Sequence, residues 1–506
     1  MNESQRSIPQ ELESFFSSPG GHSLVVRGEA GTGKTTLALH IIETMSTYDR
    51  CFYFSTRVSD YLLLRQFPWL GGSLYGEDLD EWIKNQSSWY EELQRTYEQD
   101  RKEKMLKGEG STLDEGLNSL RRSFVEKSRG TGSLRDEKGV ILEELEKVYH
   151  TVRDALPNRS LIVIDSLDAL AEKYDRSNGD IIRVLQKDLV ESYGCNLVYI
   201  LENNDRALDY LGDGVIVLET GELRSRVVRQ MRITKLRAQA IKQSRYLYTL
   251  NGGRVKAFPN IGETNFLEKV RWRRLPDKNG RTSFGWSELD RITSGGVEKG
   301  GLAIIELGAH VPTSFIEMIE RSLVANFVSH NRGVLWVPLK KASAEIARSK
   351  LVGSLDGPAV DKHVRILEVA SQVDRSPAPY CFQVEGADAS VDLKWKNLTY
   401  SLDGSASPFL SLIGFDTMES LYGEGVADQM ADHLSSIRRH MGVFVGIVSQ
   451  STRSTQRLAD IANLYVKVER SGGGLIVYGE EPFTECNVLS VEGFDDSIVT
   501  KLVPML

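Results

Sequence analysis

The sequence has few cysteines and no long apolar run. Its four cysteines, Cys51, Cys195, Cys381 and Cys486, are scattered over 506 residues without a C-x-x-C pair. This spacing offers neither a disulfide framework nor a zinc site, and it suits reduced thiols in a cytoplasm. No apolar stretch approaches the roughly 20 residues that a membrane helix needs, and the polar first residues are unlike a signal peptide. We therefore expect a cytoplasmic protein with no membrane partner.

An excess of positive charge is also missing. The formal net charge is −8, with 26% charged and 41% hydrophobic residues, a composition typical of a globular protein. This net charge argues against a protein whose whole surface binds nucleic acid, although it is compatible with a local basic patch. A chain of 506 residues is too long for one ordinary core, so we expect two or three domains.

A phosphate-binding loop is the clearest positive signal. Residues 28–35 read G-E-A-G-T-G-K-T, after the apolar run 24–26 and before a stretch with helical spacing, 36–42. Strand, glycine loop and helix in this order give the motif its mechanism, because backbone N–H groups can close around phosphates at a helix N-terminus. Lys34 is expected to reach the β- and γ-phosphates, and Thr35 to hold Mg²⁺. We predict that ATP and Mg²⁺ are bound by Gly28, Glu29, Ala30, Gly31, Thr32, Gly33, Lys34, Thr35 and Thr36.

An apolar run that ends in an acid supplies the second part of such a site. Residues 161–164 read L-I-V-I and lead to Asp165. At the carboxyl end of a buried strand, Asp165 would lie beside the loop and hold the Mg²⁺ ion with Thr35. Strands and helices go on alternating to about Glu219, which predicts a three-layer α/β/α sandwich with a mostly parallel sheet.

A stretch without acidic residues follows. Between residues 224 and 245 the basic residues are Arg224, Arg226, Arg229, Arg232, Lys235, Arg237, Lys242 and Arg245. Apolar residues alternate with them, so we predict a strand rather than a tail. Three interpretations are open: a solvated strand face, contact with the phosphates of a neighbouring subunit's nucleotide, or contact with nucleic acid or an acidic protein.

The second half of the chain repeats the first. Gly20–Gly28 and Gly300–Gly308 both span eight positions, and residues 409–416 parallel the strand that ends at Asp165. The second loop reads G-A-H-V-P-T-S-F, so Ser314 and Phe315 replace the lysine and threonine, and Pro312 removes an N–H. We predict that this half binds ATP weakly or not at all.

The repeat suggests domain limits. We predict an ATPase domain at 1–258, a linker at 259–283 and a degenerate copy of the domain at 284–506. The first copy carries about 30 extra residues within a charged, helical insertion near 60–156. That insertion is either a solvated excursion or a partner-binding arm.

These motifs together resemble the RecA-superfamily ATPases of the KaiC type. The similarity lies in the loop and in residues 162–167, 213–219 and 232–237, and residues 284–297 are similar to the family's domain-start signature. The basic run with its ending at 248–253 resembles the GvpD family of archaeal gas-vesicle regulators.

The resemblance implies a ring or filament of identical subunits with ATP between them. It also implies that Lys235 and Arg237 reach the neighbour's phosphates. The family usually has glutamates after the second strand, one of which activates the attacking water, whereas this chain has Arg57–Val58 there and Lys340–Lys341 in the repeat. Without that base we expect slow hydrolysis. Glu202 is a candidate substitute, or else a surface glutamate.

Three functions remain open at this point. The first is a cytoplasmic regulatory ATPase in which the nucleotide at Lys34 and Asp165 switches self-assembly or contact with a regulatory protein. The second is a DNA-dependent ATPase of the recombinase or helicase-accessory kind, suggested by the basic run. The third is a non-enzymatic scaffold in which ATP is only structural.

Overall fold

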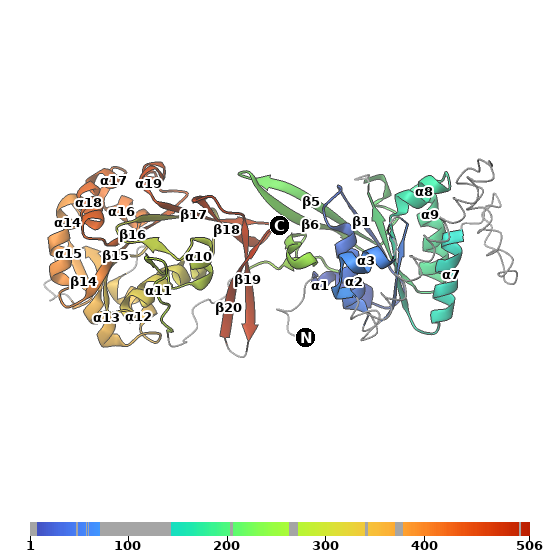
Figure 1. Cartoon of the computed structure of the whole chain (residues 1–506), viewed down its shortest axis with the longest axis horizontal. Helices are drawn as coiled ribbons and strands as arrows, with labels where there is room; N and C mark the ends of the chain where they lie inside the picture. Colours follow the sequence, from blue (N-terminus) through green and yellow to red (C-terminus); the bar gives the residue numbers. More distant parts are fainter. Residues whose placement is uncertain are drawn as a thin grey trace, which may run out of the picture.

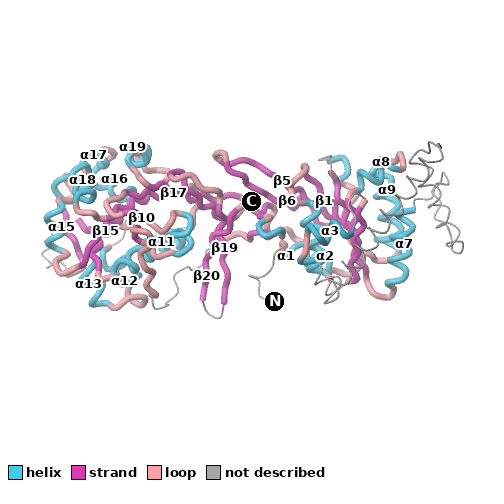
Figure 2. The backbone as a smooth tube through the Cα atoms, viewed as in Figure 1, coloured by secondary structure: helices cyan, strands magenta, loops and turns pink. Residues whose placement is uncertain are grey.

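Two α/β halves lie at opposite ends of an elongated molecule (Figure 1). The computed structural model describes residues 8–46, 49–56, 58, 60–70, 143–202, 206–262, 272–339, 343–369, 378–494 and 497–506. Each half contains one large, mostly parallel sheet with helices packed beside it (Figure 2). The predicted fold class, two tandem three-layer sandwiches, is confirmed. The insertion at 60–156 lies largely outside the described residues.

The first sheet has five parallel strands followed by an antiparallel extension. Among the described residues its strands run in the order β2 (Arg50–Ser55), β3 (Ser160–Asp165), β4 (Asn196–Leu201), β1 (Ser23–Gly28), β5 (Gly214–Leu223), β6 (Arg226–Leu236), β7 (Arg245–Thr249) and β8 (Lys256–Phe258). All pairings from β2 to β5 are parallel, whereas β6, β7 and β8 are antiparallel to their neighbours. The carboxyl ends of five strands therefore meet at one edge, where ligands of such sheets bind.

Helices cover both faces of this sheet. Successive side chains of its strands point to opposite faces, and both sets are buried. On one face, Leu24 and Val26 pack with α1 (Gln10–Ser17) and α2 (Lys34–Met45). On the other face, Val25 packs with residues of α7 (Glu143–Ala155), α8 (Leu167–Lys173), α9 (Asn178–Leu185) and the π-helical turn η3 (Gln186–Ser192). The short helix α3 (Asp60–Gln66) follows β2.

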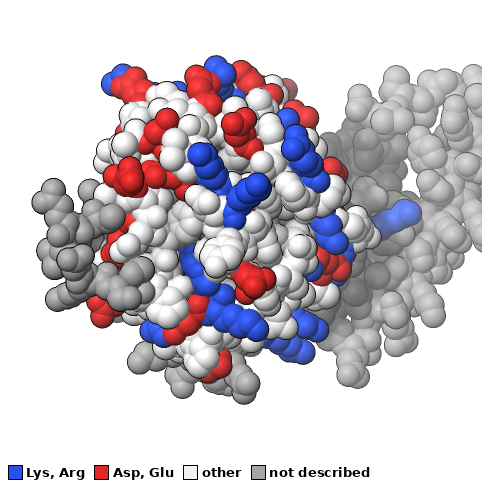
Figure 3. Space-filling view, turned by 90° about the vertical axis from the view of Figure 1, so that its left-hand side faces the viewer, with Lys and Arg blue, Asp and Glu red and all other residues white. Residues whose placement is uncertain are grey.

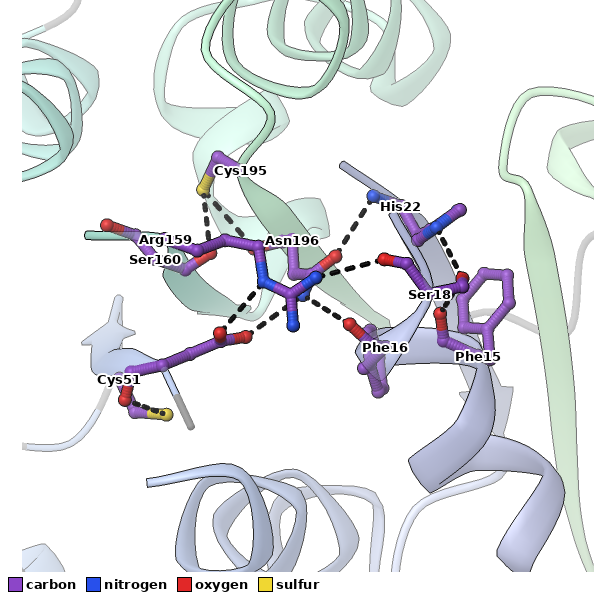
Figure 4. A network of polar contacts seen from close by, with 10 residues as sticks. Phe15, Phe16, Ser18, His22, Cys51, Arg159, Ser160, Cys195 and Asn196 are labelled. Carbon is purple, nitrogen blue, oxygen red and sulfur yellow. Dashed lines mark hydrogen bonds and ion pairs between the residues drawn. The ribbon is translucent and has the colours of Figure 1, made fainter. Parts of the chain in front are cut away.

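A buried polar network connects α1 to the amino ends of the strands of the first sheet, opposite the edge where their carboxyl ends meet (Figure 4). Asn196 Nδ2 donates to the carbonyl of Phe16 and to Asp49 Oδ2, both at 3.1 Å. Arg159 Nε donates to Asp49 Oδ1 at 2.8 Å, and its Nη1 donates to the Ser18 carbonyl at 2.9 Å. The network fixes the amino ends of the central strands.

The second sheet repeats the strand order of the first. In the described part of the second half the order is β14 (Cys381–Val384), β13 (Val364–Val369), β12 (Arg332–Val337), β15 (Ala406–Gly414), β16 (Val443–Ser449), β11 (Leu302–Leu307), β17 (Leu464–Ser471), β18 (Gly474–Glu481), β19 (Asn487–Phe494) and β20 (Ser497–Pro504). From β12 to β20 the order corresponds to that from β2 to β8, with β13 and β14 added at the edge. The predicted internal repeat is thereby confirmed.

Helices again cover both faces of the second sheet. One face packs against α11 (Thr313–Ser329), α12 (Ala344–Leu351) and α13 (Gly357–His363). The other packs against α14 (Ala389–Asp392), α15 (Trp395–Ser401), α16 (Phe415–Tyr422), α17 (Val426–Gln429), α18 (Ala431–Arg439) and α19 (Thr455–Ile461). Before this sheet come a two-stranded ribbon, β9 (Arg281–Thr282) with β10 (Val297–Glu298), and α10 (Ser287–Ile292).

The two halves share a small core of their own. Leu247 and Phe258 of the first half pack with Tyr478, Val488 and Met505 of the second. Burying apolar side chains from both halves removes their surface from water and holds the halves together.

Arg226 of the first half contacts the second half at this shared core, and we call this contact between the halves the seam. It donates to the carbonyls of Thr484 and Gly479 at 2.6 and 2.7 Å, and its guanidinium lies 3.9 Å from the centre of the Phe483 ring. Its buried charge is also 3.6 Å from Glu480. Arg226 therefore joins the halves through hydrogen bonds and charge together.

Candidate functional site

The predicted phosphate loop connects β1 to α2 at the carboxyl edge of the first sheet. Gly33 is the N-cap of α2 with φ +85°, and a Cβ there would lie 2.7 Å from the Leu250 side chain. A Cβ at Gly28 would lie 2.4 Å from the carbonyl oxygen of Leu218. Both glycines are required by the close approach of β5 and of Leu250, which follows β7, so the motif glycines have a structural reason here.

Lys34 begins α2 and is buried against the loop. Its Nζ donates to the carbonyls of Gly28 and Glu29 at 2.7 and 2.8 Å. Burial lowers the pKa of Lys34, while the carboxylates of Glu202, Asp165 and Asp168 act to raise it. The ammonium group thus lies within the field of three carboxylates at the edge where a triphosphate would bind.

Asp165 ends β3 beside the first turn of α2. Its Oδ2 accepts a hydrogen bond from the Thr35 hydroxyl at 2.6 Å and another from the Tyr53 hydroxyl at 2.6 Å. The structure therefore brings together Thr35 and Asp165, the pair predicted from the sequence. It adds Tyr53, which the sequence analysis missed because a single tyrosine in an apolar strand gives no distinct signal.

The oxygen donors fit a magnesium ion that shares its coordination with a nucleotide. Thr35 and Asp165 supply one hydroxyl and one carboxylate at hydrogen-bond distance. Within the described ranges, no group of three or more His, Cys, Asp or Glu side chains could hold a metal by itself. Mg²⁺ commonly takes one or two protein oxygens and completes its shell with water and phosphate oxygens, so this pair suits Mg²⁺ bound together with ATP.

Glu202 follows the last residue of β4 at the same edge. Its backbone N–H donates to Asp168 Oδ2 at 2.6 Å, and its carboxylate acts on the charge of Lys34. The sequence analysis named Glu202 but missed Asp168, in the first turn of α8. Arg57, where the family usually has a glutamate, lies outside the described residues, as do Lys340 and Lys341.

Lys235 and Arg237 lie at the opposite edge of the sheet from their own loop. In the pairing register, Gly28 at the end of β1 lies beside Leu218 in the middle of β5. Lys235 lies beside Val215 near the start of β5, toward the amino end of β1. The Lys235 ammonium donates to the Gly212 carbonyl at 2.5 Å, and Arg237 Nη1 donates to Asp213 at 2.8 Å.

Within one chain these two residues therefore do not face the phosphate loop. The Arg237 side chain is 70% exposed. Contact with a neighbouring subunit's phosphates stays a prediction.

The basic run divides between the two halves of the chain. Arg224 lies 3.4 Å from Glu480, and Arg226 is buried at the seam. Arg232 pairs with Glu219 on the adjacent strand at 2.6 Å. Several basic residues whose role was open from the sequence thus have partners within the chain itself.

The second loop has lost the phosphate-binding groups in structure as well as in sequence. Phe315, at the position of Thr35, is fully buried and packs edge-on against Trp286 with ring centres 5.8 Å apart. Pro312 is the N-cap of α11 and has no N–H to offer. Asp416, at the position of Asp165, accepts instead from Ser449 and Thr452 at 2.8 and 2.7 Å.

A cavity of about 460 Å³ lies beside the first loop at the seam. Its lining includes Glu29, Glu219 and Glu222 of the first half and Ser471 of the second. Three glutamates disfavour an anion, so this cavity is not an alternative phosphate site.

Comparison with known proteins agrees with this geometry. Residues 11–261 match the protein-family model described as "ATPase: KaiC". The chain therefore carries a KaiC-like ATPase domain of the RecA superfamily. It is similar over nearly its whole length to two proteins of Halobacterium salinarum. Protein GvpD2 is 24% identical over 492 residues, covering 94% of this chain and 92% of that protein, and Protein GvpD1 is 22% identical over 537 residues with the same coverage. The chain is thus a GvpD-like member of this superfamily.

None of the helices in the described residues is both long and apolar enough to cross a bilayer.

Proposed function

We propose that the chain is a cytoplasmic Mg·ATP-dependent regulator with slow ATP hydrolysis, in which the nucleotide at the first loop controls self-assembly or contact with a protein partner. One observation carries the proposal. The tandem fold keeps Lys34, Thr35 and Asp165 together in one copy, and it replaces the lysine and threonine by Ser314 and the buried Phe315 in the other.

Each residue has a defined part in this proposal. Lys34 neutralises β- and γ-phosphate charge, and the loop N–H groups orient the phosphates. Thr35 and Asp165 would hold Mg²⁺, which supplies further charge neutralisation at the phosphates when it is bound. Glu202 is the candidate group for orienting water, since it lies at the same edge as Lys34.

A protein partner agrees better than DNA with the contacts of the basic run. Arg226 is only 3% exposed, and Arg224 has glutamate partners. The end of the second half that points away from the first half carries Lys and Arg interspersed with Asp and Glu, with no continuous basic patch among the described residues in this view (Figure 3). The resemblance to GvpD regulators also favours a regulatory protein as the partner.

The decisive experiment measures ATPγS binding, ATP turnover and native mass of the full chain, with and without DNA. Lys34→Ala is expected to weaken binding by about tenfold to a hundredfold, because it removes a charge-assisted contact. Lys187→Ala is the control, since Lys187 is an exposed lysine on η3.

Each rival function predicts a different result. Equal binding by Lys34→Ala and wild type would refute the proposal. Turnover stimulated by DNA and lost steeply with salt would favour the DNA-dependent ATPase. Tight binding without turnover in the assembled state would favour the scaffold.

A further inference from the structure

The phosphate loop is held from its outer side by two residues of the antiparallel extension. The Tyr248 hydroxyl donates to the carbonyl of Thr32 at 2.6 Å, and Arg229 Nη1 donates to the carbonyl of Gly31 at 3.0 Å. We call Tyr248 and Arg229 the loop clamp.

The loop clamp orients the groups that a phosphate needs. Each carbonyl shares a planar trans peptide with the next N–H, so the two groups point in opposite directions. Holding the Gly31 carbonyl therefore fixes the N–H of Thr32, and holding the Thr32 carbonyl fixes the N–H of Gly33. In the structure the Thr32 N–H donates to the Glu29 carbonyl with N and O 3.4 Å apart. Two consecutive peptide planes of the loop are thus fixed before any nucleotide arrives, which reduces the ordering cost of binding.

Arg229 is itself held by the second half of the chain. Its Nε donates to the carbonyl of Leu506 at 2.8 Å, and its backbone N–H lies 3.0 Å from the sulfur of Met505. These residues follow β20, an edge strand of the second sheet. Figure 1 shows the chain end between the two halves.

The segment 504–506 is anchored through Pro504 and Met505, whereas Leu506 is 56% exposed and its N–H donates to the Thr249 hydroxyl at 3.4 Å. Met505 is 2% exposed and packs in the shared core of the two halves. The Thr249 hydroxyl donates to the Pro504 carbonyl at 2.8 Å, and the Met505 N–H donates to the Cys486 carbonyl at 2.8 Å. A rigid segment can hold Arg229 in one orientation, whereas a loose one could not.

We propose that segment 504–506 of the second half sets the nucleotide affinity of the first loop through Arg229. Arg229 is a positioning residue, because it contacts the loop carbonyl on the side away from the phosphate-binding groups. The inference rests on the proposed function, since it concerns the same loop. It gives the second half a role at the ATP site although its own loop has lost the binding groups.

The test measures Mg·ATPγS affinity of the full chain by calorimetry for Arg229→Gln and for deletion of Leu506. We expect both to weaken binding, Arg229→Gln by about tenfold, because a charge-assisted hydrogen bond to the loop is lost. Arg232→Gln is the matched control: it lies on the same strand but pairs with Glu219. Combining Arg229→Gln with the deletion should weaken binding no further than Arg229→Gln alone, because both changes break one path.

A second readout needs no nucleotide. Hydrogen exchange in the loop peptide 28–36 should accelerate in Arg229→Gln and in the Leu506 deletion, and stay at the wild-type rate in Arg232→Gln. Wild-type exchange in both variants would overturn the inference. So would weaker binding by Arg229→Gln with normal binding by the deletion, since Arg229 would then act without segment 504–506.

The two readouts separate failure of the inference from failure of the proposed function. If wild type and Lys34→Ala do not differ in binding, the proposed function fails, and exchange alone decides whether segment 504–506 controls the loop. If wild type binds nucleotide, and both Arg229→Gln and the Leu506 deletion match its affinity, the inference fails while the proposed function stands.

Discussion

Tyr53 and Thr35 donate to the same oxygen of Asp165, each at 2.6 Å. Tyr53 lies on β2 and Asp165 on β3, and the neighbouring Ser55 is the pairing partner of Asp165 in the parallel register. If Thr35 turns toward a magnesium ion, the tyrosine contact still holds the carboxylate in place. The relationship makes Tyr53 a support for the metal-binding side of the site.

Tyr53→Phe should therefore raise the Mg²⁺ concentration needed for ATPγS binding by about threefold to tenfold, since a hydrogen bond to a charged group is lost. Titration of Mg²⁺ at fixed nucleotide measures this. Tyr149→Phe is the control, because its hydroxyl also donates to a carboxylate, Asp188 at 2.7 Å, on a helix. An unchanged Mg²⁺ midpoint in Tyr53→Phe would show that the tyrosine only packs.

Glu202→Gln should lower ATP turnover by about a hundredfold and leave ATPγS affinity nearly unchanged, because a group that orients water acts in the chemical step. Phosphate release and calorimetry measure the two quantities. Glu222→Gln is the control, since Glu222 is an exposed glutamate in the same half. Wild-type turnover by Glu202→Gln would remove Glu202 from the reaction.

Phe315→Ala should destabilise the second half by about 3–5 kcal/mol, because it leaves a cavity where a fully buried ring packs against Trp286. Urea unfolding followed by tryptophan fluorescence measures the loss. Tyr400→Ala, which truncates a side chain that is 86% exposed, should change stability by less than about 0.5 kcal/mol. A comparable result for both variants would contradict the assignment of Phe315 to the core.

His433 should make the second half sensitive to acid. Burial lowers its pKa from 6.5 to about 4, and its ring nitrogens contact Ser411 and the Leu393 carbonyl. Between these pH values the unfolded chain binds more protons than the folded one, so stability falls as pH falls. From these two pKa values the loss at pH 5 is about 2 kcal/mol.

His433→Gln tests this sensitivity by difference. The free energy of unfolding, measured from pH 7 to 5, should fall less in the variant than in wild type. A difference is needed because buried Glu320 acts in the opposite direction. Its pKa is raised to about 7, so the folded state binds this proton more tightly than the unfolded chain and gains stability as pH falls. Parallel pH profiles of the two proteins would argue against protonation of His433.

The candidate site could be predicted only in part, and the residues that sequence reasoning missed share one physical reason. Gly28 to Thr35 are adjacent in the chain, and Asp165 ends an apolar run, so pattern alone identified them. Tyr53 meets Asp165 across 112 positions, and Arg229 meets Gly31 across 198. No local pattern in one sequence marks such pairs.

The sequence by itself determined the alternation of strands and helices, the tandem repeat, the intact first loop and the damaged second one. These follow from periodicity and from residue types a few positions apart, where the chain itself fixes the geometry. The tertiary structure decided where the basic run goes. Arg226 is buried at the seam, Arg229 holds the loop, and Arg237 lies at the far edge of the sheet. Their charge is the same, and only the packing of the two sheets gives each arginine a different partner.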